Sequence, residues 1–221
     1  MIRVWGRRNS LNVQKVMWTL GELDLDYERH DMGGSFGFTD AYRQINPNSV
    51  VPAIQDGDLT LYESNSCVRY LSHQYGQGTL LPDDVADAAR ADQWMDWQCS
   101  TLSGAFFPIF INLIRLPAGQ QDQGAVDRGI RQTAALLQRL ELHLEGRDYL
   151  LGNNLTMGDI PLACHLYRWF EMDIPRPEMP NLERYYENLC SRPAYRYHVM
   201  IPFGSNVDEW NREEERNRGI Q

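Results

Sequence analysis

The residues best placed to do chemistry stand at the starts of expected secondary-structure elements, and the first of them is Ser10. Ser10 directly precedes Leu11, from which apolar residues recur at helical spacing. A hydroxyl at this position can cap the backbone N–H groups of the helix. It can also donate a hydrogen bond to an anion at the helix amino end, where the dipole favours negative charge and lowers the pKa of a thiol. The residue type leaves both roles open.

The dipeptide Val51-Pro52 is the second such feature, because it interrupts a strand-like run between a turn and a hairpin. Proline cannot donate a hydrogen bond to a sheet ladder. A cis bond here would turn the backbone N–H and C=O of Val51 outward, and an extended peptide can pair with such groups as an added strand. An ordinary trans-proline at a sheet edge is the alternative.

Glu63 and Ser64 open another expected helix. The Ser64 hydroxyl and the helix N–H groups can hold a carboxylate, and the Glu63 carboxylate can hold an ammonium group. Together they would form a receptor for the head of an α-amino acid, whereas the alternative is a helix cap beside a solvated acid. The three features in this order fit one ligand, a small γ-glutamyl tripeptide that carries a thiol.

An α/β unit within residues 1–80 is expected to position these residues. Hydrophobic patterns predict strands over Ile2–Trp5, Tyr27–His30, 50–54 and Leu59–Tyr62, and helices over 11–23, 39–45 and Ser64–Tyr75. The resulting order is β-α-β-α-β-β-α, the order of a thioredoxin-like domain. The predicted fold class is an α/β thioredoxin-like N-terminal domain plus an all-α C-terminal helical domain.

No convincing strand follows the first unit. Residues 81–87 are interpreted as a linker, and 88–203 as an all-helical domain with helices over 88–102, 126–144 and 156–172 and two shorter ones after Pro180 and Pro193. Residues 204–221 form a polar tail that we expect to be mobile or only loosely docked.

Composition narrows the function classes. The net charge of −9 disfavours nucleic acid or an anionic membrane as a partner. The sequence has no apolar run long enough to span a membrane and no secretory leader, so a cytoplasmic location is expected. The four cysteines lie far apart with no CxxC and no Cys/His cluster, which argues against a metal site and against a redox dithiol.

From residue 1 to about 200 the chain resembles the cytosolic glutathione transferase superfamily, with features of its bacterial theta and nu classes. The stretches that carry this resemblance are WGRRNSLNVQKVMWTLGELDLDYE, INPNSVVPAIQDGDLTLYESNSCVRYL and LTMGDIPLACHLYRWF. The last contains Thr156-x-x-Asp159, a capping box where the family keeps one. The middle stretch is the most specific.

The resemblance implies roles for the residues singled out above. Ser10 resembles the residue that stabilises the glutathione thiolate, and Asn12 a second polar contact, because Ser-x-Asn is similar to the Thr-x-Asn of nu-class members. Val51 is expected to pair its backbone with the cysteinyl part of glutathione, and Pro52 to be the cis proline. The remaining pair, Glu63 and Ser64, would bind the γ-glutamyl head.

The chain departs from the family pattern at Val50, where many members have a basic residue that contacts the glycine carboxylate of glutathione. An arginine elsewhere or the 33–36 loop would have to replace it. No cysteine lies near Ser10, so the mixed-disulfide route of omega-like thiol transferases is excluded.

The second substrate is expected to be a small apolar electrophile bound against the helical domain. Aromatic candidates for its pocket, given as alternatives to core packing, are Phe106, Phe107, Phe110 and Tyr167. The predicted function is conjugation of the glutathione thiolate to this electrophile by a homodimer that acts in detoxification, with glutathione as co-substrate and no metal. The alternatives are a glutathione-dependent disulfide or peroxide reductase and a non-catalytic binding module.

Overall fold

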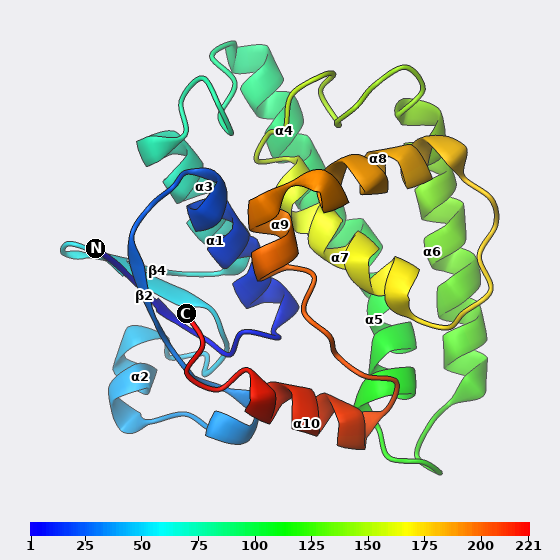
Figure 1. The fold of residues 1–221 in the computed structure, drawn as a ribbon, viewed down its shortest axis with the longest axis horizontal. Coiled ribbons are helices and arrows are strands. Elements are labelled where there is room, and N and C mark those ends of the chain that lie inside the picture. The colour runs from blue at the N-terminus through cyan, green and yellow to red at the C-terminus, as the bar shows by residue number, and fades with distance from the viewer.

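A four-stranded sheet lies at one side of a larger group of helices in the computed structural model, which describes residues 1–221 (Figure 1). Its strands are β1 (Ile2–Trp5), β2 (Tyr27–His30), β3 (Ala53–Asp56) and β4 (Leu59–Tyr62). They lie in the order β2-β1-β3-β4; β1 and β2 are parallel, and β3 pairs antiparallel with β1 and β4. The thioredoxin-like topology is confirmed, although β3 begins at Ala53 rather than at residue 50.

Short helices connect and cover these strands. They are α1 (Leu11–Glu22), the 3-10 turn η1 (Gly34–Phe36), α2 (Asp40–Ile45) and α3 (Ser64–Tyr75). Apolar residues at helical spacing in α1, such as Val13, Val16 and Leu20, pack with Ile2 and Val4 of β1 in a small core. This packing fixes the axis of α1 over the sheet.

The second half of the chain is helical, as predicted. Its elements are α4 (Val85–Trp97), η2 (Gln98–Leu102), α5 (Ser103–Phe110), η3 (Ile111–Arg115), α6 (Gln123–His143), α7 (Asp159–Glu171), α8 (Pro180–Ser191), α9 (Pro193–His198) and α10 (Val207–Arg216). The helix expected over 88–102 is longer, because the π-helical turn η2 connects α4 to α5 and a second one, η3, extends α5 to Arg115 without a break.

This continuous run, Val85–Arg115, is the one segment long and apolar enough to cross a membrane by length and composition alone, which corrects the expectation that the sequence has none. Its buried side chains, among them Met95, Leu102 and Ile109, belong to the largest hydrophobic core of the protein. Packing in that core accounts for the apolar side chains on the buried face of this run.

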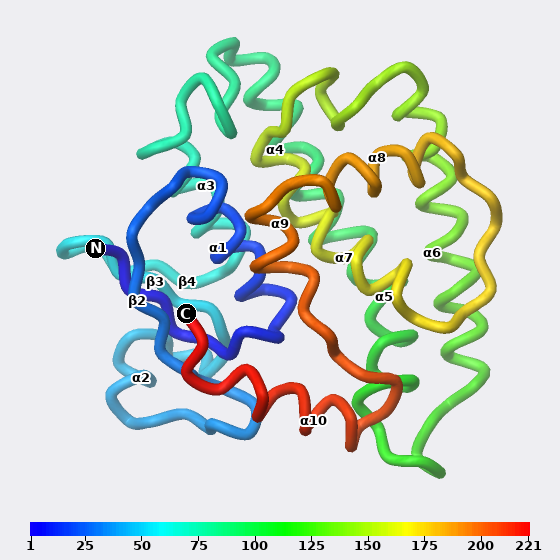
Figure 2. The backbone as a smooth tube through the Cα atoms, viewed as in Figure 1, coloured from blue at the N-terminus to red at the C-terminus, as the bar shows by residue number.

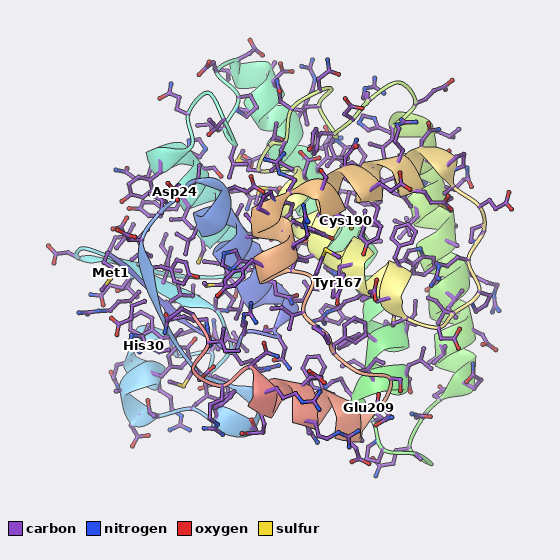
Figure 3. All side chains as sticks on the ribbon, viewed as in Figure 1. Met1, Asp24, His30, Tyr167, Cys190 and Glu209 are labelled. Atoms are coloured by element: carbon purple, nitrogen blue, oxygen red, sulfur yellow. The ribbon has the colours of Figure 1, made fainter.

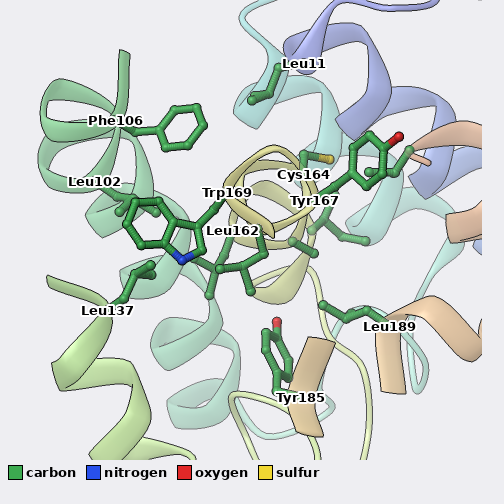
Figure 4. Packing of buried hydrophobic residues seen from close by; sticks show 14 of the residues in the cluster. Leu11, Leu102, Phe106, Leu137, Leu162, Cys164, Tyr167, Trp169, Tyr185 and Leu189 are labelled. Carbon is green, nitrogen blue, oxygen red and sulfur yellow. The ribbon is translucent and has the colours of Figure 1, made fainter. Parts of the chain in front are cut away.

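The largest core joins the helical half to α1. It contains 36 buried residues, many of them from α7, and includes Leu11 and Trp18 of α1 (Figure 4). Trp18 also packs edge-on against Tyr195 of α9, with ring centroids 4.9 Å apart. Helix α1 is therefore held by the sheet on one side and by α7 and α9 on the other.

Asp159 fixes the start of α7 much as the Thr156-x-x-Asp159 pattern predicts. The backbone N–H and the hydroxyl of Thr156 donate to Asp159 Oδ2 at 2.8 and 3.0 Å. The Leu150 N–H and the Tyr185 hydroxyl donate to Oδ1, each at 2.9 Å. Because Asp159 is fully buried, these four bonds replace the hydration of its carboxylate. The helix itself begins at Asp159, three residues later than expected.

The C-terminal segment is docked, and the expectation of a mobile or loosely docked tail was wrong. Helix α10 runs back towards the sheet, and the chain ends beside the edge strand β2 (Figure 2). Trp210 is 1 % exposed, and Glu214, one turn later, forms an ion pair with Arg7 at 2.8 Å. The polar composition concealed this docking because it depends on one tryptophan, one paired acid and hydrogen bonds that join residues 217–221 to Arg8, Arg29 and Asp31 rather than on an apolar stripe.

The contact of α10 with the η1 loop depends on a glycine. Gly34 has a φ of +61°, and a Cβ built there would lie 2.6 Å from Oε1 of Glu214. That carboxylate instead accepts a hydrogen bond from the Ser35 N–H at 2.7 Å. The C-terminal helix is thereby joined to the loop that follows β2.

Candidate active site

Ser10 precedes α1 in an extended conformation, but its side chain makes no capping hydrogen bond. The residue is 8 % exposed and lines a cavity of about 360 Å³. The sequence leaves two roles open for Ser10, and the structure does not show the first of them, capping of α1. Its hydroxyl stands at a helix amino end, where a hydrogen-bond donor and the dipole act on an anion together.

The cavity lies between the two halves of the molecule. Its lining comes from the β1–α1 segment, the η1 and α2 loops, α5, η3, α7 and α10, and consists of Arg7, Ser10, Leu11, Asn12, Gly34, Phe38, Ser49, Val50, Val51, Phe107, Phe110, Ile111, Arg115, Arg168 and Trp210. A larger cavity of about 690 Å³ beside the linker contains none of the predicted site residues.

The Val51-Pro52 peptide bond is cis, as predicted. Val51 lies outside the ladder of β3, and neither its backbone N–H nor its C=O has a hydrogen-bond partner in the chain. The preceding C=O, of Val50, accepts bonds from the Tyr42 hydroxyl at 2.5 Å and the Asn46 side chain at 2.9 Å. These bonds hold the loop while Val51 keeps its backbone groups available beside the cavity.

Glu63 and Ser64 lie at the start of α3, as expected, and Glu63 adopts a φ of 69° in the left-handed region. The Ser64 hydroxyl donates to Asn12 Oδ1 at 3.2 Å. Since Asn12 lines the cavity, this bond connects the start of α1 to the start of α3. Neither Glu63 nor Ser64 lines the cavity itself, so the predicted site extends from it along the α1–α3 side.

Lys15 is a functional candidate that the sequence analysis missed. It is 3 % exposed, and its Nζ donates to Ser64 Oγ, Asn65 Oδ1 and Gln98 Oε1 at 3.4, 3.1 and 3.1 Å. All three acceptors are neutral, and burial lowers the pKa of Lys15 to about 8. The available signal was the only lysine of the chain, placed within the apolar pattern of a helix.

The predicted aromatic pocket is half right. Phe107 and Phe110 line the cavity. Phe106 and Tyr167 belong to the buried core around α7, and the prediction that they line the pocket was wrong (Figure 4). Phe106 packs on His165 at 5.2 Å between centroids, and Tyr167 lies inside the helical half against Phe203 at 5.8 Å (Figure 3). Helical spacing marks a face, but it does not say whether that face meets a core or a cavity.

Four further side chains that the sequence did not single out line the cavity: Arg7, Arg115, Arg168 and Trp210. They come from segments far apart in the chain, and no local motif links them. The structure contains no group of three or more His, Cys, Asp or Glu residues that could hold a metal ion. Burial raises the pKa of the Cys67 and Cys164 thiols to about 12, and no cysteine lines the cavity.

A thioredoxin-like unit with a cis proline, joined to a helical half across a cavity that Ser10 lines, defines a glutathione transferase. The family model of the glutathione S-transferase N-terminal domain matches residues 5–79, and that of the C-terminal domain matches residues 93–193. The chain belongs to the glutathione S-transferase family, and it is an enzyme of that family.

Individual relatives agree. Glutathione S-transferase GstB of Escherichia coli is 43 % identical over 206 residues, 91 % of this chain and 99 % of the relative. The theta class glutathione S-transferase of Xanthomonas axonopodis pv. citri, with glutathione bound, has a TM-score of 0.88 and 44 % identity over 92 % of this chain and 99 % of its own. A Burkholderia graminis glutathione transferase with two glutathione molecules bound per subunit has a TM-score of 0.77 and 27 % identity, covering 91 % and 88 % of the two chains.

Proposed function

We propose that the protein binds glutathione with its sulfur beside Ser10 and conjugates the thiolate to an electrophile whose apolar body lies against Phe107 and Phe110. Val51 pairs its backbone with the cysteinyl part, and Glu63 and Ser64 hold the γ-glutamyl head. Asn12 connects these two parts of the site through its bond with Ser64. The protein forms no covalent intermediate, and its contribution is activation of the nucleophile and proximity.

The reaction is a displacement at carbon. The glutathione thiol releases its proton to solvent on binding, and the thiolate sulfur supplies the electron pair for a new C–S bond. The bond from that carbon to the leaving group breaks, and the leaving group departs with its electron pair. Ser10 donates a hydrogen bond to the sulfur, which stabilises the thiolate relative to the thiol.

One observation carries this proposal. Ser10 lies at the amino end of a twelve-residue helix and lines the cavity, and its side chain makes no capping hydrogen bond. The Xanthomonas relative, which binds glutathione, shares this fold over nearly the whole chain. A hydroxyl held at a helix amino end with no partner in the protein is suited to an anionic ligand atom.

The test is a pH titration of the ultraviolet absorbance of the thiolate in the complex saturated with glutathione. We expect the pKa of the bound thiol to lie at least one unit below that of free glutathione. An unshifted thiol pKa would contradict the mechanism while leaving the fold assignment intact.

A glutathione-dependent disulfide or peroxide reductase is the second candidate. It is favoured by the common position of Ser10 and Asn12 on the cavity wall and by the two glutathione molecules in the Burkholderia graminis relative. Turnover of an aryl halide and of a small disulfide by the same preparation separates the two activities. Dominant disulfide turnover would replace conjugation as the main reaction.

We further propose a cytoplasmic homodimer that acts in detoxification. Leu59 and Tyr62 on the edge strand β4 are 40 % and 38 % exposed, and apolar residues on an edge strand suit contact with a second copy. Sedimentation of the full chain tests this state, and a single monomeric species would contradict it.

A further inference from the structure

The cavity wall is cationic in a strongly acidic protein. Arg7, Arg115 and Arg168 all line it, although the chain carries a net charge of −9. One carboxylate lies beside them, that of Glu214 in α10, and both of its oxygens already have partners. Its Oε2 pairs with Arg7 Nε at 2.8 Å, and its Oε1 accepts a bond from the Ser35 N–H. Two guanidinium groups therefore remain without a counter-charge.

Arg115, the last residue of η3, is the more accessible of these two. Its guanidinium lies over the Trp210 ring at 4.4 Å, and its buried Nε has no hydrogen-bond partner. The pKa of Arg115 is lowered by burial, even though the nearby Glu214 carboxylate opposes that shift. Arg115 thus places hydrogen-bond donors at the cavity wall for which the protein supplies no acceptor.

Arg168 of α7 adds a second positive charge at the same part of the cavity wall, and it is more deeply buried than Arg115. It is 4 % exposed, donates to the Asn9 C=O at 2.8 Å and lies 4.2 Å over the Phe110 ring. Burial, and after it the neighbouring Arg7 and Arg115, lower the pKa of Arg168 to about 9. Ring stacking satisfies the planar faces of these groups, but it does not offset their charge.

We propose, building on the proposed conjugation reaction, that the electrophile carries an anionic group, a carboxylate or its equivalent, which Arg115 binds with Arg168 behind it. The apolar body of the same molecule lies against Phe107, Phe110 and Ile111 of α5 and η3. The anionic group is unchanged in the reaction. Only the C–S bond forms and the bond to the leaving group breaks.

Two matched electrophiles test this specificity: 4-(bromomethyl)benzoate and its neutral isostere 4-(bromomethyl)benzamide. After correction for the uncatalysed rates, we expect kcat/KM to favour the benzoate by about tenfold or more, the effect of one charge-assisted hydrogen bond. Arg115→Gln should lower kcat/KM for the benzoate by about tenfold to a hundredfold and for the benzamide by less than about twofold. The KM for glutathione should not change.

Arg139→Gln is the matched control, because Arg139 is exposed on α6 away from the cavity and its loss changes the net charge equally. It should leave both substrates unaffected. An equal loss on both substrates in Arg115→Gln, with a higher KM for glutathione, would assign Arg115 to glutathione itself and overturn the proposal. Unchanged turnover of the benzoate would overturn it as well.

A binding experiment separates failure of this inference from failure of the proposed function. Calorimetry with the two products, S-(4-carboxybenzyl)glutathione and S-(4-carbamoylbenzyl)glutathione, requires no turnover. Tighter binding of the carboxy product, lost in Arg115→Gln, supports the inference. Equal binding of both products overturns the inference alone, and binding of neither overturns the proposed function with it.

Discussion

The two sides of the cavity are built in different ways. The side that we propose for glutathione comes from residues 10–12 and the 50–52 turn and continues beyond the cavity to the start of α3, all inside one small α/β unit, and it offers mostly backbone groups and hydroxyls. The side that we propose for the electrophile is assembled from α5, η3, α7 and α10, which come from distant parts of the sequence, and it offers arginines and aromatic rings. On this proposal one side suits a constant ligand, and the other selects the second substrate.

The largest effect should come from the glutathione side. We expect Ser10→Ala to lower kcat/KM by about a hundredfold or more, because it removes the donor that stabilises the developing thiolate. The free energy of unfolding should change by less than about 0.5 kcal/mol, since the side chain caps nothing. Steady-state kinetics and urea denaturation measure the two quantities.

Thr39→Ala is the matched control for this experiment. Thr39 caps α2, accepting from the Tyr42 N–H at 3.1 Å, and does not line the cavity. Its loss should cost about 1 kcal/mol of stability and leave kcat/KM unchanged. If Ser10→Ala behaved like Thr39→Ala, the contrast between a constant catalytic side and a variable side would lose its basis.

The same contrast explains what could be predicted from the sequence. The element order and the positions of Ser10 and Ser64 follow from turn signals and helix starts, which are local. The residues alone left a trans bond open at Pro52, and the cis bond and the contact at Asn12 were predicted from the family resemblance. Arg115 and Trp210 meet only because α10 folds back across η3, which no pattern of neighbouring residues encodes. Phe106 and Phe107 were indistinguishable in sequence, because the core face and the cavity face of one helix are equally apolar.

A second prediction concerns Lys15, which the glutathione side buries among neutral oxygens next to Ser64. The nearby Glu63 carboxylate acts on the Lys15 ammonium without a direct hydrogen bond, and a ligand carboxylate at the start of α3 would supply a direct partner. We expect Lys15→Met to weaken binding of S-methylglutathione, a ligand without a free thiol, by about tenfold. Calorimetry measures the affinity directly.

The pH dependence of that affinity distinguishes charge from packing. Burial lowers the pKa of Lys15 to about 8, so the ammonium is charged below this pH and becomes neutral above it. A carboxylate ligand favours the charged form, and the affinity of the unmodified protein should therefore fall as pH rises through 8. In Lys15→Met, the pH dependence of the affinity reflects titration of the ligand alone. If the affinities of both proteins changed with pH in parallel, Lys15 would have a purely structural role.

The smallest effect is expected at Val50, where the glutathione side lacks the basic residue that many family members have. Val50 is 48 % exposed and lines the cavity together with Arg7. We expect Val50→Lys to lower the KM for glutathione by about two- to fivefold without changing kcat, because an exposed ion pair with the glycine carboxylate adds uniform binding only. Val50→Met controls for side-chain length, and high salt should abolish the gain. If Val50→Lys left the KM for glutathione unchanged, another residue would already bind the glycine carboxylate. Arg7 is the basic residue in this part of the cavity. It would then be assigned to glutathione rather than to the electrophile side.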